Sequence, residues 1–267
     1  MKRSKRLDER PDDLPPRKRH ALVLLSGGFD SVAALHWAAE NYDEMRAVSF
    51  DYGQVNRDAE LYAAQWVAQR RHIPWDRLVL ADAVKGLGSL HPPFPGIDPN
   101  GVSRANIPAR NPLLLSTAAG HAHRVFPPDY AGRLARIDLI IGATMDDAAF
   151  PDCRAEFFEA FTQVLALGCA GVVDLQVRAP WVQKRKKEVL LWCMVRPEAI
   201  EDVRLFSVSC YAGTRCGACD PCTLRARAFA ECNLEDGKAG QPVMTGGDPA
   251  RDSELAQHCR NLGRGQL

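Results

Sequence analysis

Six residues whose types suit phosphate binding lie between an apolar run and a helical pattern. They are Ser26, Gly27, Gly28, Phe29, Asp30 and Ser31, and they follow the apolar residues 21–25. Paired glycines let the backbone approach a ligand closely, and the first N–H groups of the next helix have no partner within it. The helix dipole adds about half a positive charge there. We call residues 26–31 the glycine loop and predict that it binds phosphate; a strand–helix turn without a ligand is the alternative.

Four of the nine cysteines are spaced closely enough to surround one metal ion. They are Cys210, Cys216, Cys219 and Cys222, and we call residues 210–222 the cysteine loop. Four thiolates suit a tetrahedral Zn²⁺ ion, and they also suit an iron–sulfur cluster. Because the protein supplies all four ligands, we expect a closed, structural site. Zn²⁺ is the predicted occupant, an iron–sulfur cluster is the main alternative, and four thiols without a metal are the third reading.

Strands alternate with helices along the chain and must position these two groups. Apolar runs predict strands at 21–25, 46–50, 78–80, 137–142 and 172–177, and helical spacing predicts helices at 31–41, 57–71, 111–125, 155–167 and 184–192. This order is typical of an α/β fold with a parallel sheet covered on both faces. Ligands bind at the carboxyl ends of such strands, where the glycine loop and residues 142–147 both fall. The glycine- and proline-rich residues 85–108 predict a long loop.

Composition places the chain among ordinary soluble proteins. The 267 residues carry 34 Lys and Arg against 33 Asp and Glu, so no global charge argues for nucleic acid. We find neither a signal peptide nor an apolar run long enough to cross a membrane, and we expect a cytoplasmic protein without a membrane partner. The predicted domains are a basic disordered leader (1–19), a nucleotide-binding domain (20–205), a metal-binding segment packed on it (206–232) and a flexible tail (233–267).

The glycine loop resembles the pyrophosphate loop of the N-type ATP pyrophosphatases. Within that superfamily the chain is similar to the 7-cyano-7-deazaguanine synthase family of the queuosine pathway. The similarity spans about residues 20–230 and is carried by several blocks in the same order: 51–54, 60–61, 107–111, 115–116, 147, 151–154, 179–180, 186, 188, 209–211 and 216–229. The Pro-Asp-Cys-Arg block at 151–154 and the four cysteines are its most specific parts. The resemblance implies a parallel-sheet, Rossmann-like ATP-binding domain with a four-cysteine zinc subdomain, and a homodimer.

The resemblance also implies an activity. The family converts 7-carboxy-7-deazaguanine and ammonia to the nitrile with ATP, through adenylated intermediates and with the help of Mg²⁺. On this reading the glycine loop holds pyrophosphate, with Tyr52 and Gln54 also in the ATP site. Asp30, Arg110, Asp147 and Lys186 are the expected catalytic residues. Arg110, Asn111, Asp152 and Arg154 are expected to bind the substrate.

Plainer readings exist for several of these residues. Lys186 sits in a basic run, so an exposed cation is its alternative, and a surface ion pair is the alternative for Arg110. Asp146, Asp147 and Asp152 supply carboxylates for Mg²⁺ or for a guanine-like base, and we expect at least one of them to cap a helix. Cys153 is expected to be a packed thiol rather than a nucleophile.

Two short segments depart from the family pattern. Val55-Asn56 stands where the family has Arg-His, and Ala149-Phe150 stands where it has Gly-Tyr. These departures motivate an alternative acceptor. In that reading the chain keeps the carboxylate adenylation but presents the deazaguanine to a protein or nucleic acid in a modification or defence cassette.

Overall fold

The computed structural model describes residues 18–80, 97–128 and 134–237. Within these ranges five strands form one sheet in the order β3-β2-β1-β4-β5, and every neighbouring pair is parallel. The strands are β1 (His20–Leu24), β2 (Glu44–Asp51), β3 (Trp75–Val79), β4 (Arg136–Ile141) and β5 (Asp174–Arg178). The expected α/β class with a parallel sheet is confirmed.

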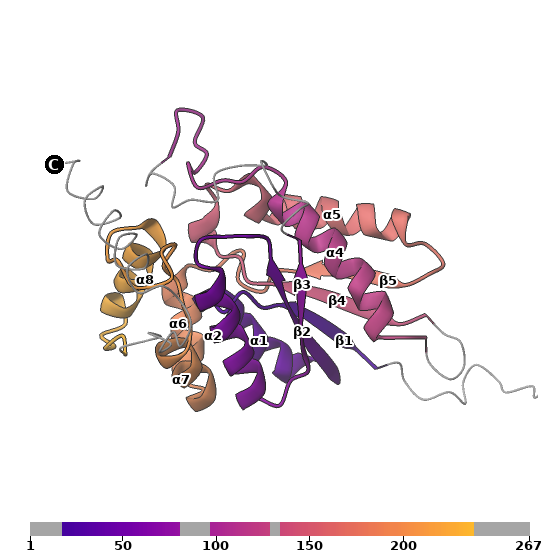
Figure 1. Cartoon of the computed structure of the whole chain (residues 1–267), viewed down its shortest axis with the longest axis horizontal. Helices are drawn as coiled ribbons and strands as arrows, with labels where there is room; N and C mark the ends of the chain where they lie inside the picture. The colour runs from indigo at the N-terminus through magenta and orange to yellow at the C-terminus, as the bar shows by residue number, and fades with distance from the viewer. Residues whose placement is uncertain (1–17, 81–96, 129–133, 238–267) are drawn as a thin grey trace, which may run out of the picture.

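Helices cover both faces of the sheet (Figure 1). One face carries α1 (Phe29–Asn41), α2 (Arg57–Arg70), α6 (Lys186–Met194), α7 (Pro197–Leu205) and α8 (Asp220–Glu231). The other face carries α4 (Arg110–Val125) and α5 (Ala155–Gly168). Two short 3₁₀ helices, η2 (Met145–Asp147) and η3 (Pro151–Cys153), follow β4.

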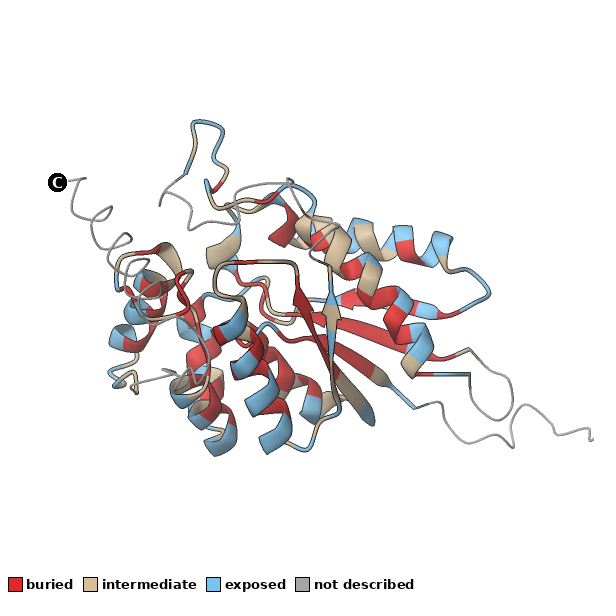
Figure 2. Cartoon of the chain, viewed as in Figure 1, coloured by how far each residue is buried: buried red, intermediate tan, exposed pale blue. Residues whose placement is uncertain are grey.

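The central strand β1 is apolar and buried from Ala21 to Leu24, because both of its faces are covered. Ala21 and Val23 pack into the core under α1, whereas Leu22 and Leu24 point to the opposite core under α4 and α5. Alternate side chains of a strand leave opposite faces of the sheet, so a doubly covered strand needs apolar residues at every position. The burial colouring shows β1, β2 and β4 as mostly red at the centre of the molecule, whereas the edge strand β3 is tan and pale blue (Figure 2).

Several element predictions needed correction. The edge strand β3 begins at Trp75 rather than at residue 78, because its polar residues Asp76 and Arg77 hide the strand in a search for apolar runs. Helix α6 begins at Lys186, two residues later than predicted. Helices α7 and α8 were not predicted, although a proline in the first turn marks the start of each.

Some predictions fall on residues that the structure leaves undescribed. Residues 1–17 of the expected leader, residues 85–96 of the expected long loop and residues 238–267 of the expected tail lie outside the described ranges. In the described part of the chain, no helix has the length and apolar character that a membrane span requires.

Candidate active site

Two adjoining cavities lie at the sheet edge near the neighbouring strands β1 and β4, where the strand order changes direction. The first measures about 260 Å³ and the second about 450 Å³. Both lie at the carboxyl ends of the strands, the place where open parallel sheets bind their ligands. Five residues belong to both walls, so the cavities form one continuous site: Asp30, Glu60, Asp147, Phe150 and Tyr211.

The glycine loop forms the wall nearest β1 and opens α1. Its hydroxyls face each other, with Ser26 Oγ and Ser31 Oγ 3.0 Å apart. Ser26 Oγ accepts a bond from the Gly28 amide at 3.2 Å, and Gly28 is the N-cap of α1 without a side-chain cap. The N-cap residue of α1 therefore offers no side-chain acceptor to the backbone amides of the first helical turn. The Phe29 ring instead packs into the core, edge-on to Phe229.

Close backbone contacts fix the shape of this loop. Gly27 has φ +81°, and a Cβ on it would lie 2.4 Å from the Glu60 carbonyl oxygen of α2. A Cβ on Gly142, directly after β4, would lie 2.6 Å from the Ser31 backbone nitrogen. Neither position has room for a side chain, so α2 and the end of β4 hold the loop from two sides.

Lys186 lies buried beside the loop and pairs with Asp30. Its Nζ is 2.5 Å from Asp30 Oδ2 and 3.9 Å from the nearer oxygen of Asp147. Burial raises the pKa of Asp30 to about 6 despite the opposing effect of Lys186. Burial lowers the pKa of Lys186, but its two carboxylate neighbours outweigh burial and the net pKa is raised. The alternative of an exposed cation at Lys186 is therefore wrong.

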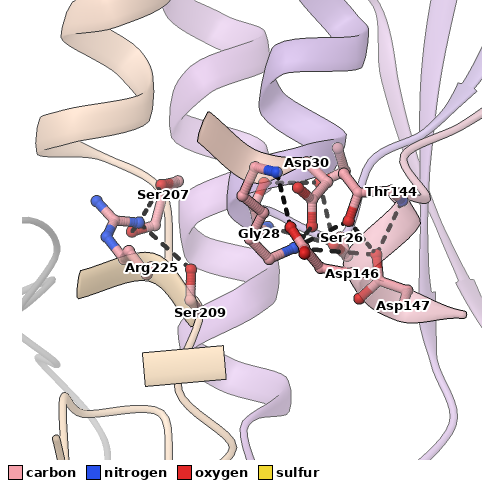
Figure 3. Close-up of polar contacts among 11 residues, drawn as sticks. Ser26, Gly28, Asp30, Thr144, Asp146, Asp147, Ser207, Ser209 and Arg225 are labelled. Carbon is pink, nitrogen blue, oxygen red and sulfur yellow. Dashed lines mark hydrogen bonds and ion pairs between the residues drawn. The ribbon is translucent and has the colours of Figure 1, made fainter. Parts of the chain in front are cut away.

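Three aspartates use their carboxylates to hold helix starts. Asp146 Oδ2 accepts the Lys186 amide at 2.8 Å, which fixes the first residue of α6. Asp152 Oδ2 accepts the Asn111 amide at 3.0 Å, next to the first residue of α4. Asp147 Oδ2 accepts the amide and hydroxyl of Thr144 (Figure 3). The expectation that at least one of the three caps a helix is confirmed for all three, and two of them position the helices that carry Lys186 and Arg110.

Arg110 is partly buried and lines the first cavity. Burial lowers the pKa of Arg110, but the electrostatic effects of Tyr52, Cys153 and Asp152 are larger in sum. The net pKa is raised, so the guanidinium stays charged. Tyr52 is hydrogen-bonded to Arg110 and shares this cavity wall. Gln54 lies in the same wall, where its side-chain oxygen accepts the Tyr52 amide at 3.1 Å.

The remaining predicted residues are placed differently. Asn111 is buried in the wall of the first cavity and donates its side-chain amide to the Asp152 carbonyl at 2.8 Å. Arg154 Nε donates to the Ala148 carbonyl, and neither Arg154 nor Asp152 is among the described residues that line the two cavities. Cys153 is buried, and burial raises its pKa to about 12, which confirms the packed thiol.

The four predicted cysteines come together in the cysteine loop. All four are buried, and their Sγ atoms lie within 4.8 Å of one another. Zn–S bonds of about 2.3 Å in a tetrahedron place sulfurs about 3.8 Å apart, so this spacing suits one central ion. The loop packs on the first turn of α2, where Asn56 Nδ2 donates to the Cys210 carbonyl at 3.3 Å.

Comparison with known proteins identifies the family of this chain. The family model described as queuosine biosynthesis protein QueC matches residues 20–233. The chain belongs to this family. A 7-cyano-7-deazaguanine synthase of Ectopseudomonas mendocina is 36% identical over 82% of this chain and 96% of its own length. One of Saccharophagus degradans is 32% identical with the same coverage. The family resemblance read from the sequence is confirmed.

One comparison with solved structures gives a match of low similarity. The U34-tRNA thiolase NcsA from Methanococcus maripaludis, solved with its [4Fe-4S] cluster, has a TM-score of 0.38 and 17% identity. The alignment covers 96% of this QueC-family chain and 68% of the thiolase.

For two residues that line the cavities of this QueC-family chain, the sequence predicted no role. Glu60 lies in a segment that carries the family resemblance. Its position in a helix, six residues after Gln54, did not indicate a catalytic or binding role. Tyr211 follows Cys210 directly and was read only as part of the cysteine pattern. Both line the two cavities. The folding of α2 and the cysteine loop against the glycine loop brings them there.

Proposed function

We propose that the chain converts 7-carboxy-7-deazaguanine, ATP and ammonia to 7-cyano-7-deazaguanine, AMP and pyrophosphate. Membership of the QueC family supports the pathway. The observation that carries the proposal is one continuous site that is lined by the glycine loop, buried Lys186 and Arg110. A group suited to phosphate and a group suited to a carboxylate within one site are what the adenylation of a carboxylate requires, and this supports the proposal.

Lys186 and Arg110 bind different substrates, ATP and the deazaguanine carboxylate. The amides and hydroxyls of the glycine loop and the Lys186 ammonium bind the departing pyrophosphate, and they stabilise the charge that develops on it. Arg110 orients the substrate carboxylate through two parallel hydrogen bonds. Tyr52, Gln54 and Asn111 complete this part of the site.

Asp30 and Asp147 would hold Mg²⁺ in this site. Among the described residues no hydrogen-bond donor reaches the buried Oδ1 atom of Asp30, and a bound cation would satisfy this acceptor. Bound Mg²⁺ supplies charge neutralisation at the phosphate oxygens. At the cysteine loop, the close approach of the four Sγ atoms favours a single Zn²⁺ ion over a cluster.

The reaction needs two activations. The substrate carboxylate attacks the α-phosphate of ATP and releases pyrophosphate, and ammonia then displaces AMP to give the amide. A second ATP adenylates the amide oxygen, and loss of AMP and the remaining N–H protons leaves the nitrile. Each activation removes an oxygen that is otherwise a poor leaving group.

The test is a product assay on the full chain. We expect purified protein with ATP, Mg²⁺, ammonium and 7-carboxy-7-deazaguanine to form the nitrile, identified by mass spectrometry. Release of pyrophosphate without amide or nitrile would overturn the proposal. That result would instead favour the reading in which the activated deazaguanine goes to a protein or nucleic acid. The homodimer stays a prediction, and sedimentation of the same sample tests it.

A further inference from the structure

Glu60 is a carboxylate at the junction of the two cavities. The proposed reaction has so far assigned it no role. It lies in the first turn of α2 and belongs to both cavity walls. Its backbone oxygen packs against Gly27 of the glycine loop. Glu60 therefore stands where the phosphate part of the site meets the part that contains Arg110, which is where an adenylated carboxyl carbon would lie.

Neutral groups hold this carboxylate rigidly and leave its charge without a direct ion pair. Asn56 Nδ2 donates to Oε1 at 2.9 Å, and Gln54 Nε2 donates to Oε2 at 3.1 Å. Both donors are anchored in turn, since Gln54 also bonds the Phe50 carbonyl and Asn56 the Cys210 carbonyl. Within the described part of the chain, no cation lies at ion-pair distance from Glu60.

A fixed carboxylate of this kind suits a small cationic ligand. A carboxylate has about four acceptor positions, and the two amides occupy only two of them. Holding an ionised group away from water is costly unless an opposite charge pairs with it. Asp30 and Asp147 line the same cavities and add negative charge. The charge of Arg110 acts on Glu60 from a distance and partly offsets the effect of burial on its pKa. Lys186 lies within 4 Å of both Asp30 and Asp147, whereas among the described residues no cation comes as close to the Glu60 carboxylate.

We propose that Glu60 binds ammonium and takes a proton from it, so that the ammonia released attacks the adenylated carboxyl group. This inference rests on the proposed function. One N–H bond of ammonium breaks and its proton moves to the Glu60 carboxylate. The nitrogen lone pair forms the C–N bond, and the C–O bond to AMP breaks with its electron pair on the AMP phosphate oxygen. The nitrogen then gives a second proton to solvent water, which leaves the amide. Burial raises the pKa of Glu60, which makes its carboxylate a stronger base.

The experiment compares two nucleophiles that differ in charge. Ammonium must lose a proton before it attacks, whereas hydroxylamine is neutral near pH 7 and traps the adenylate as a hydroxamate without a base. With Glu60→Gln we expect the ammonium-dependent rate to fall about 100-fold or more. Hydroxamate formation and ATP–pyrophosphate exchange should stay within about threefold of wild type, since neither requires that proton transfer. Glu231→Gln, an exposed carboxylate on α8, is the matched control.

The possible results separate this inference from the proposed function. An equal loss with both nucleophiles would mean that Glu60 only shapes the site, and an unchanged ammonium rate would mean that it has no role; either result overturns the inference. If the wild-type chain gives no pyrophosphate exchange with the deazaguanine carboxylate, the proposed function itself fails. Thermal unfolding of each variant verifies that the fold is retained.

Discussion

At the scale of single residues, the site depends on a lysine whose neighbours keep it charged and still. Lys186 is held by Asp30 through its side chain and by Asp146 through its backbone amide. Two contacts of this kind leave the ammonium little freedom before a ligand arrives. Preorganised charge is effective in catalysis because the protein does not have to reorganise during the reaction.

Removal of this charge gives the first prediction. We expect Lys186→Ala to lower pyrophosphate release by about 100-fold or more, the usual effect of losing one group that stabilises a developing charge. Stopped assays of pyrophosphate with ATP and the deazaguanine carboxylate measure it. Lys187→Ala, at an exposed position one residue along the same helix, should keep nearly full activity. Equal losses in both variants would contradict the role of Lys186.

A second prediction concerns the space around the glycine loop. Gly142→Ala would put a methyl group 2.6 Å from the Ser31 nitrogen, so the loop or the end of β4 must move. We expect a stability loss of about 1–3 kcal/mol and weaker ATP binding. Gly120→Ala is the control: its Cβ meets nothing within 4 Å, and alanine in a helix favours stability by up to about 1 kcal/mol. Chemical unfolding and ATP titration distinguish the two variants.

At the scale of elements, one buried carboxylate connects three helices behind the site. Asp202 of α7 is fully buried and lies 3.0 Å from His36 Nε2 of α1 and 2.6 Å from Arg71 Nε at the end of α2. Burial alone would raise the pKa of Asp202, but the bonds from His36 and Arg71 outweigh it and the pKa is lowered. The carboxylate therefore stabilises the folded chain in its ionised form.

The third prediction follows from the sign of that shift. Asp202→Asn should cost about 2 kcal/mol at neutral pH, because two charge-assisted hydrogen bonds weaken. An acid whose folded pKa is lowered contributes stability above its unfolded value of 3.8, and this contribution is lost as the pH falls through the folded value. The difference between wild type and variant should thus shrink below about pH 4, as measured by urea unfolding. Glu201→Gln, in an exposed pair, should cost less than about 1 kcal/mol at any pH.

Elements that carry apolar runs were the predictable part of this fold. The buried strands β1 and β4 and the loop between β1 and α1 follow from the local sequence, since both faces of each strand demand apolar residues. Strand β3 was misjudged because an edge strand tolerates polar residues such as Arg77. The cysteine pattern predicted a metal-binding group but not what it touches. Glu60 and Tyr211 reach the site only through packing between distant segments, which no local pattern encodes.

At the scale of the whole molecule, the cysteine loop is joined to the phosphate-binding part of the site. The Val208 amide donates to the Gly27 carbonyl at 2.8 Å. Buried Arg225 of α8 donates to the Ser207 hydroxyl at 2.7 Å and the Ser209 hydroxyl at 3.3 Å, beside the glycine loop in the same view (Figure 3). Residues 207–209 therefore connect the metal-binding segment to Gly27.

Metal removal gives the fourth prediction. We expect about one zinc ion per chain by elemental analysis, as four closed thiolate ligands imply. Cys219→Ser should lose the ion, expose the amides of residues 207–222 to hydrogen exchange and weaken ATP binding through Val208. Cys232→Ser, at a cysteine outside the group of four, should do none of these. A chain that loses all its metal yet keeps its exchange protection and ATP affinity would contradict a structural role.

The strand order has a consequence for synthesis of the protein. The strand that carries the glycine loop needs β4 as its second neighbour, and β4 begins only at Arg136. A nascent chain on the ribosome exposes one edge of β1 until that segment has emerged from the exit tunnel. Segments from the last part of the chain then have to dock before Lys186 and Val208 meet the loop. An open strand edge can pair with other chains, so we expect this protein to be most prone to aggregation before β4 has emerged.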